Sequence, residues 1–192
     1  MAGTLRITGG RLSRRRFMVP KAADLGLTRP TGDMARAAVF SSLGTLVQDA
    51  NVLDLFAGSG AYGFEAISRG ASSVLFLEKT RETAQCIEYN AQSLAIKEHC
   101  RVLAKDAIHF VQGSSLETYE LVFVDPPYSL VLDALFWKSL LVFLHQSSVV
   151  VFRCKSKKDF VCPFDYQITR EKSYGGTTIF FLTLKDDPVG IS

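Results

Sequence analysis

Residues 51–63 of the chain read Asn-Val-Leu-Asp-Leu-Phe-Ala-Gly-Ser-Gly-Ala-Tyr-Gly. The first part of this stretch is apolar except for Asn51 and Asp54, and glycines follow at Gly58, Gly60 and Gly63. Because glycine accepts backbone conformations that other residues avoid, the stretch predicts a buried strand, a tight turn and the start of a helix. Such a unit opens a parallel α/β sheet and lets a ligand approach the backbone closely.

The rest of the chain repeats this alternation of strand and helix. Short β-branched or aromatic runs predict strands at residues 51–56, 74–78, 101–104, 121–125 and 148–153. Helical spacing of apolar residues predicts helices at residues 31–47, 62–68, 81–94, 107–112 and 130–145. Alternation of this kind builds a parallel sheet that is covered by helices on both faces.

The end of the chain departs from the alternation. Residues 166–172 and 177–184 predict two strands that are joined across residues 173–176 without a helix. A short turn joins antiparallel neighbours, so we expect a mostly parallel, Rossmann-like sheet of seven strands with a C-terminal antiparallel hairpin. This is the arrangement of class I methyltransferases, whereas dinucleotide dehydrogenases usually continue with another parallel unit.

Length and composition indicate one folded domain. The chain has 192 residues, of which 47% are hydrophobic and 21% charged, as in ordinary soluble folded proteins. Its longest apolar stretch, residues 130–144, contains Asp133 and Lys138 and is too short to cross a membrane, and no export signal is evident. The four cysteines and three histidines lack metal-ligand spacing. We therefore expect a cytoplasmic protein without a metal site.

Charge is concentrated near the N-terminus. Residues 1–36 hold eight Lys or Arg against two Asp, a net charge of +6 in a chain whose total is +3. A basic arm on a slightly acidic body indicates local binding of phosphates, as in a nucleic-acid partner. We expect an N-terminal extension at residues 1–30, with hairpin-like strands at residues 4–8 and 16–19, and a main domain at residues 31–192. The candidate RNA-binding residues are Arg11, Arg14, Arg15, Arg16, Arg29 and Arg36. The alternative is that Arg14 to Arg16 form a solvated turn.

The glycine turn is ambiguous by itself, because Gly58-x-Gly60-x-x-Gly63 also satisfies the fingerprint of dinucleotide-binding proteins. Two carboxylates favour S-adenosylmethionine: Asp54 can meet its amino acid moiety, and Asp106 can accept from its adenine amine. Glu78 ends the next strand, where it can accept both ribose hydroxyls. The alternatives are a helix N-cap for Asp106 and a surface charge for Glu78. The predicted cofactor-binding residues are Asp54, Phe56, Ala57, Gly58, Ser59, Gly60, Glu78, Lys79, Asp106 and Ala107.

The most specific signal is the strand at residues 121–124 followed by Asp125-Pro126-Pro127-Tyr128. The prolines stiffen the loop and leave Asp125 at the carboxyl end of a central strand, beside the expected cofactor. An exocyclic amine is a poor nucleophile because its lone pair is delocalised into the ring. The Asp125 carboxylate and the Pro126 carbonyl can each accept one N–H and turn the lone pair toward a methyl donor, while Tyr128 stacks on the base. These four residues are the candidate catalytic loop; the alternative is a proline-terminated strand with an aromatic anchor.

Taken together, these segments resemble the bacterial 16S ribosomal RNA guanine-N2 methyltransferase family, of the guanine(966) type. The resemblance runs through nearly the whole chain, at residues 6–10, 27–31, 54–70, 125–128 and 170–175. It implies a methyl transfer from S-adenosylmethionine to one guanine of 16S rRNA, on an assembled or nearly assembled small subunit. It also implies that the basic arm holds phosphates near a guanine that is splayed from its neighbours. Apart from the resemblance, we expect a monomer without a membrane partner.

The chain departs from this family's pattern at a few positions. The family commonly has a basic residue and a glutamate where this chain has Met34 and Ala37, and an aspartate where it has Gly176. An acidic residue is usual where the fifth strand here runs into Phe152-Arg153-Cys154. These departures bear on substrate contacts more than on the chemistry.

Three other functions stay open at this point. An adenine-N6 methyltransferase on DNA or RNA would use the same catalytic loop. A nicotinamide-dependent oxidoreductase would explain the glycine turn but not residues 125–128. A non-catalytic ribosome-assembly factor would use the basic arm alone, although Asp125, Pro126 and Tyr128 are intact.

Overall fold

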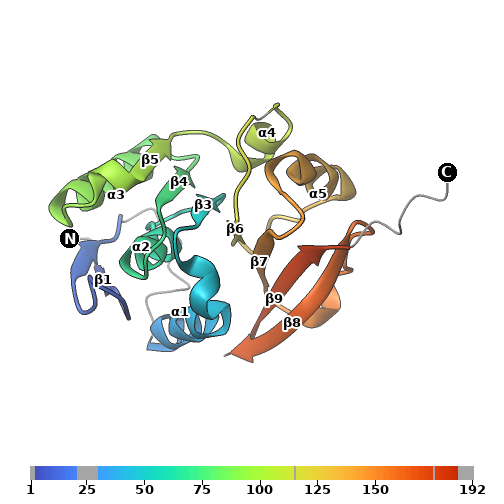
Figure 1. Ribbon diagram of the computed structural model, residues 1–192, viewed down its shortest axis with the longest axis horizontal. Coiled ribbons are helices and arrows are strands. Elements are labelled where there is room, and N and C mark those ends of the chain that lie inside the picture. Colours follow the sequence, from blue (N-terminus) through green and yellow to red (C-terminus); the bar gives the residue numbers. More distant parts are fainter. Residues whose placement is uncertain (1–2, 21–29, 115, 175, 186–192) are drawn as a thin grey trace.

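The computed structural model describes residues 3–20, 30–114, 116–174 and 176–185 and contains the expected seven-stranded sheet. Its strand order is β5-β4-β3-β6-β7-β9-β8, in which the first five strands are parallel and β9 pairs antiparallel with both β7 and β8 (Figure 1). The strands are β3 (Asn51–Asp54), β4 (Ser73–Leu77), β5 (Cys100–Leu103), β6 (Leu121–Val124), β7 (Val149–Cys154), β8 (Tyr166–Tyr174) and β9 (Thr177–Leu184). The Rossmann-like class I methyltransferase architecture is thereby confirmed.

Helices cover both faces of the sheet, as expected. The α-helices are α1 (Pro30–Leu43), α2 (Ala61–Ser68), α3 (Arg81–Ser93), α4 (Ala107–Val111) and α5 (Ala134–Leu140). Short 3-10 turns are η1 (Gly44–Val47), η2 (Lys97–His99), η3 (Leu141–Phe143) and η4 (Lys157–Asp159). In Figure 1, α1, α2 and α3 lie on one side of the sheet and α4 and α5 on the other.

The alternation of side chains along each strand divides the core in two. On β3, Val52 packs with the helices of the first side, whereas the next residue, Leu53, packs with α4 and α5. The aromatic side chain of Trp137 on α5 fills the second core and makes an edge-to-face contact with Phe152 of β7. The parallel strands are therefore buried on both faces, which explains why they read as nearly continuous apolar runs.

The N-terminal residues form a small hairpin of β1 (Thr4–Arg6) and β2 (Arg16–Met18), close to the predicted positions. The hairpin is joined to the domain by polar contacts. Thr8 donates from its backbone N and its Oγ1 to the buried Glu65 of α2, at 2.8 and 2.7 Å. Met18 N donates to Asn90 Oδ1 of α3 at 2.9 Å, and Leu5, Ile7, Phe17 and Val19 belong to the first core.

Two predicted helices differ from the observed ones. The helix expected at residues 130–145 begins only at Ala134, because the Asp133 carboxylate caps it by accepting from Phe136 N at 2.8 Å. The helix expected at residues 31–47 tightens into η1 at Gly44, whose φ is +55°. The hydrophobic pattern continues through both changes, so the pattern alone did not mark them.

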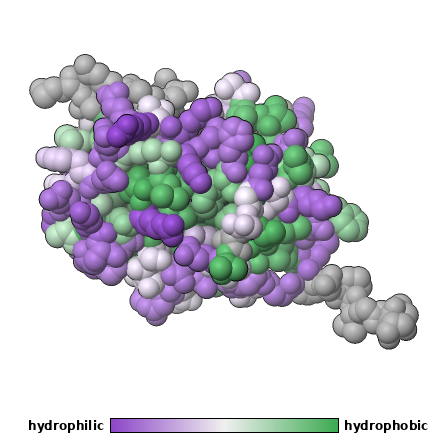
Figure 2. Space-filling model, turned by 90° about the horizontal axis from the view of Figure 1, so that it is seen from above, coloured by the Kyte–Doolittle hydropathy of each residue, from purple (hydrophilic) through white to green (hydrophobic). Residues whose placement is uncertain are grey.

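Seen from above, hydrophilic side chains cover much of the surface and apolar side chains form patches between them (Figure 2). Within the described ranges, no helix combines the length and the apolar character that crossing a membrane would require.

Candidate active site

A cavity of about 550 Å³ opens at the carboxyl ends of the parallel strands. Its walls come from the segments that follow β3, β4, β5 and β6, and from the end of β7. Ligands of open α/β sheets bind at this edge, and cavities of this size hold small-molecule cofactors. Of the residues predicted from sequence, it is lined by Phe56, Ala57, Gly58, Ser59, Glu78, Lys79, Asp106, Ala107, Asp125, Pro126, Pro127 and Tyr128.

The glycine turn after β3 forms one wall of this cavity. Gly60 has a φ of +79°, and a Cβ there would lie 2.8 Å from the ring of Phe64, so only glycine fits without a shift. At Gly63 a Cβ would lie 2.1 Å from the Phe76 ring of β4, which explains the third glycine as a close contact between α2 and the sheet. Gly60 itself is the N-cap of α2 and does not line the cavity.

Asp54 lies behind the cavity wall, not in it. Its side chain is buried, Oδ2 accepts from Gly63 N at 3.2 Å, and Oδ1 has no hydrogen-bond partner among the described residues. Burial, reinforced by the negative charge of Asp125, raises the pKa of Asp54 to about 8. Without a ligand Asp54 is therefore largely protonated at neutral pH. A cation that reached Oδ1 would favour the ionised carboxylate and give this oxygen the partner that it lacks.

Glu78 and Asp106 follow β4 and β5, and both residues line the cavity. The Glu78 carboxylate accepts from Gly58 N at 3.0 Å and from Thr80 N at 2.8 Å, so it is held in place and is more than a surface charge. Asp106 caps α4, accepting from Ile108 N at 2.9 Å, and pairs with Lys79 Nζ at 3.0 Å. The capping interpretation of Asp106 is thus confirmed, and its side chain still borders the cavity.

The surroundings of Asp106 keep it ionised. Burial alone would raise the pKa of Asp106, but the hydrogen bond from Lys79 and those from the backbone of α4 outweigh it and hold the pKa below its usual value. The carboxylate therefore remains an acceptor at neutral pH.

The candidate catalytic loop stands at the end of β6. Asp125 is nearly buried, with 8% of its side chain exposed, and forms an ion pair with Arg153 Nε through Oδ1. Burial raises the pKa of Asp125, whereas the charge and the hydrogen bond of Arg153 oppose the rise. Tyr128 shares a hydrogen bond with Thr177 Oγ1 at 2.9 Å, and half of its surface is open to a ligand.

Sequence reasoning did not propose several residues that line the cavity. They are Leu55, Ala61, Tyr62, Leu77, Thr80, Thr83, Ile108, Ser129, Leu130 and Arg153. Most of them adjoin residues that were proposed. Arg153 does not, yet it stands at the carboxyl end of β7, and the rule that selected Glu78 and Asp125 would also have found it.

The predicted RNA-binding arginines that the structure describes do not line the cavity. Arg11, Arg14, Arg15 and Arg16 are exposed, but Arg11 N donates to Ser68 O at the last residue of α2, and Arg15 Nη2 donates to Ser93 O at the last residue of α3. The cavity is lined from the opposite ends of these helices, by Ala61 and Thr83. Along α3, from Thr83 to Ser93, this separation is roughly 15 Å, at 1.5 Å per residue.

Arg36 requires a correction. Its side chain is completely buried, so it cannot reach a phosphate in this structure. It pairs with Glu65 at 3.4 Å and with Asp33 at 3.0 Å, and it donates to the carbonyl of Arg6. Its role is to join α1, α2 and the hairpin. Arg29 lies outside the described residues.

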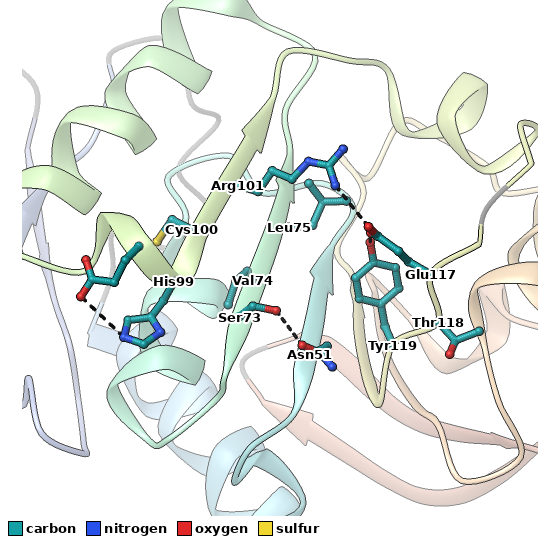
Figure 3. A pocket seen from close by; sticks show the side chains of 11 residues that line it. Asn51, Ser73, Val74, Leu75, His99, Cys100, Arg101, Glu117, Thr118 and Tyr119 are labelled. Atoms are coloured by element: carbon teal, nitrogen blue, oxygen red, sulfur yellow. Dashed lines mark hydrogen bonds and ion pairs between the residues drawn. The ribbon is translucent and has the colours of Figure 1, made fainter.

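A second cavity of about 390 Å³ lies at the other edge of the sheet (Figure 3). Asn51, Ser73 and Cys100, the first residues of β3, β4 and β5, line it. Its polar side chains are tied to one another: Ser73 donates to Asn51 at 2.8 Å, and Arg101 pairs with Glu117 at 3.5 Å. Amino ends of parallel strands are not where such sheets bind ligands, so this cavity is not the candidate site.

The described residues contain no group of three or more His, Cys, Asp or Glu that could hold a metal ion.

Comparison with known proteins shows the family to which the chain belongs. The family described as conserved hypothetical protein 95 matches residues 5–183. The chain belongs to this family. The chain is similar to the ribosomal RNA small subunit methyltransferase D of Haemophilus influenzae, which is 31% identical over 180 residues, or 90% of each chain. The protein of the same name from Escherichia coli strain K12 is 37% identical over 127 residues, 66% of this chain and 62% of the relative.

Solved structures are also similar to this chain. One, an Escherichia coli protein assigned provisionally as a methyltransferase, has a TM-score of 0.84 at 29% sequence identity and covers 95% of this chain and 99% of its own. The sheet of this chain also closes with antiparallel pairing, which the dehydrogenase alternative does not explain.

Proposed function

We propose that the protein transfers a methyl group from S-adenosylmethionine to the exocyclic N2 amine of one guanine in 16S rRNA. We further propose that it acts as a monomer on an assembled or nearly assembled small subunit, in the cytoplasm and without a metal. The names of the relatives support the RNA substrate. The proposed chemistry is supported mainly by one observation: Asp125, Pro126 and Tyr128 line the same cavity as the glycine turn.

The residues fit the proposed cofactor. S-adenosylmethionine carries an electrophilic methyl group, a positively charged amino group, a ribose and an adenine. The unpartnered Asp54 Oδ1 suits the amino group, and the fixed Glu78 carboxylate suits the ribose hydroxyls. Asp106 follows β5 and suits the adenine amine. Its Oδ1 caps α4, so the oxygen for the amine is Oδ2, which also pairs with Lys79.

The catalytic loop orients the base. The Asp125 carboxylate and the Pro126 carbonyl accept the two N–H groups of the amine and pull its lone pair out of conjugation with the ring. Tyr128 is fixed through its hydroxyl by Thr177 and offers its ring for stacking. Catalysis then rests on positioning of the base and on the negative charge of Asp125.

The basic extension at residues 1–30 binds RNA away from the reacting base in this proposal. Arg11, Arg14, Arg15 and Arg16 neutralise phosphates at the far ends of α2 and α3, and residues 31–192 carry the chemistry. Arg36 is left out, because it is buried.

Mass spectrometry of digested RNA tests the proposal. The purified protein is incubated with S-adenosylmethionine and with small ribosomal subunits that lack the modification, and naked 16S rRNA is treated in parallel. We expect N2-methylguanosine at one site, with more product on the subunit. N6-methyladenine would indicate the adenine alternative, and binding of S-adenosylmethionine without any methylated product on either substrate would contradict the proposed acceptor.

A further inference from the structure

Arg153 lies beside the residues that would bind the proposed target base. The parallel pairing of β6 and β7 sets Val124 beside Phe152, so the residues that follow, Asp125 and Arg153, are neighbours at the carboxyl edge. Only 15% of the Arg153 side chain is exposed, and Nε donates to Asp125 Oδ1. Its guanidinium carbon lies 5.5 Å from the centre of the Tyr128 ring. One cation thus contacts both the carboxylate and the aromatic ring of the catalytic loop.

Most of the hydrogen-bonding capacity of Arg153 is unused. A guanidinium carries five N–H groups, and within the described part of the chain Arg153 makes only the hydrogen bond to Asp125. Arg153 lines the cavity, so the N–H groups that do not contact Asp125 are available to a ligand there. A largely buried donor group of this kind calls for an acceptor on the ligand.

Guanine supplies that acceptor in the right order. Its Watson–Crick edge presents the carbonyl oxygen O6, the N1–H and the N2 amine in sequence, an acceptor followed by two donors. With the amine and N1–H on the Asp125 carboxylate, O6 comes next to the guanidinium that holds this carboxylate. An adenine whose amine took the same place would set its unprotonated N1 against the carboxylate and a C–H group against the guanidinium.

We propose that Arg153 and Asp125 select guanine together, with Asp125 accepting from the N1–H and the amine and Arg153 donating to O6. This inference rests on the proposed function and adds to it the group that reads the base. Pairing of arginine with guanine O6 is frequent in nucleic-acid recognition, because it rewards the right base and leaves donors unpaired against the wrong one.

Replacing the target guanine by 6-thioguanine tests the contact to O6. Sulfur is a much weaker acceptor than oxygen, while N1–H and the amine remain. Small subunits are rebuilt with either base at the methylated position, and kcat/KM is measured for the wild type, Arg153→Met and Arg153→Lys. Arg101→Met is the matched control, since Arg101 is an exposed arginine that lines the other cavity.

We expect 6-thioguanine to lower kcat/KM of the wild type and of Arg101→Met by roughly tenfold, as for a lost hydrogen bond to a charged group. Arg153→Met should lose a similar factor on guanine and show no further loss on 6-thioguanine, whereas Arg153→Lys should keep part of the discrimination. Cofactor affinity and thermal unfolding, measured in parallel, identify a variant that fails to fold. If Arg153→Met is folded and still discriminates tenfold, the contact to O6 is refuted while the proposed function stands. If the wild type forms no N2-methylguanosine on guanine, the proposed function fails and this inference falls with it.

Discussion

At the scale of single residues, Asp125 is the side chain on which the proposed chemistry depends most. Its carboxylate would contact the base amine and not the cofactor, so Asp125→Ala should lower kcat by roughly 100- to 1000-fold, as for removal of one group that stabilises a transition state. Cofactor affinity should stay nearly unchanged. Single-turnover methylation and calorimetric titration with S-adenosylhomocysteine measure the two quantities.

The control for Asp125→Ala is Asp165→Ala, because Asp165 is an exposed carboxylate just before β8 and borders neither cavity. This variant should keep the wild-type rate. Equal activity of Asp125→Ala and the wild type would refute the proposed role of the catalytic loop.

Asp54 makes the cofactor-free protein sensitive to pH. Burial, together with the charges of Asp125 and Glu78, raises the pKa of Asp54 from 3.8 to about 8, although the Gly63 N–H opposes the rise. As pH rises from about 4 to about 8, the unfolded chain loses this proton while the folded chain retains it. The free energy of unfolding contributed by Asp54 should therefore be largest below pH 4 and fall through this window.

Asp54→Asn removes that titration. Urea unfolding of both proteins at about pH 5 and about pH 8 should show a smaller loss of stability for Asp54→Asn than for the wild type. Parallel changes in the two proteins would mean that Asp54 is ionised in the folded protein throughout.

At this scale the sequence predicted which residues line the cavity better than it predicted their surroundings. Asp125, Glu78 and Asp106 were found because each follows a strand of a parallel sheet. Arg36 was taken for a phosphate ligand because charge alone does not reveal burial; its partner Glu65 lies 29 positions away. The ion pair of Arg153 with Asp125 depends on the register of β6 and β7, which no local pattern encodes.

At the scale of elements, one buried carboxylate joins the hairpin to the helices. Glu65 of α2 has no exposed surface and accepts from Thr8, Arg36 and Arg69. Glu65→Gln removes its charge and leaves the Arg36 guanidinium buried with less compensation, which should lower the free energy of unfolding by about 3 kcal/mol. Chemical denaturation measures the loss, and hydrogen exchange should be faster in residues 4–18.

Glu88→Gln serves as the matched control, since Glu88 is an exposed glutamate on α3. Its effect should stay within about 0.5 kcal/mol. Unchanged protection of the hairpin in Glu65→Gln would show that the apolar contacts of Leu5 and Phe17 hold it without the carboxylate.

The elements themselves were largely predictable. Their order, the parallel pairing and the terminal hairpin follow from apolar periodicity and turn residues, which act locally. The late start of α5 did not follow, because the apolar run continues through residues 130–132 and only the Asp133 cap marks the boundary.

At the scale of the whole molecule, the exposed arginines of the N-terminal extension and the candidate active site lie at opposite ends of α2 and α3. Changing Arg11, Arg14 and Arg15 together to Glu should therefore weaken RNA binding without changing kcat at saturating RNA. Each lost phosphate contact should reduce the slope of log affinity against log salt by roughly 0.7 to 0.9. Filter binding at several salt concentrations, with single-turnover rates, measures both.

Lys138→Glu is the control for charge reversal, because Lys138 is exposed on α5, on the other face of the sheet. It should leave the salt slope nearly unchanged. If the triple variant also keeps the wild-type slope, the arginines form a solvated turn and the RNA contacts lie elsewhere.

The loop that carries these arginines takes its shape from main-chain groups. Ile7 N donates to Arg15 O and Arg14 N to Ile7 O, both at 2.9 Å, while Arg11 N and Leu12 N donate to Ser68 at 2.7 and 2.9 Å. None of these four bonds uses a guanidinium. Mutation can therefore exchange the side chains along the loop while the path of its backbone is preserved. The affinity for a polyanion can then change in small steps, in evolution or by design, without compensating changes elsewhere in the fold.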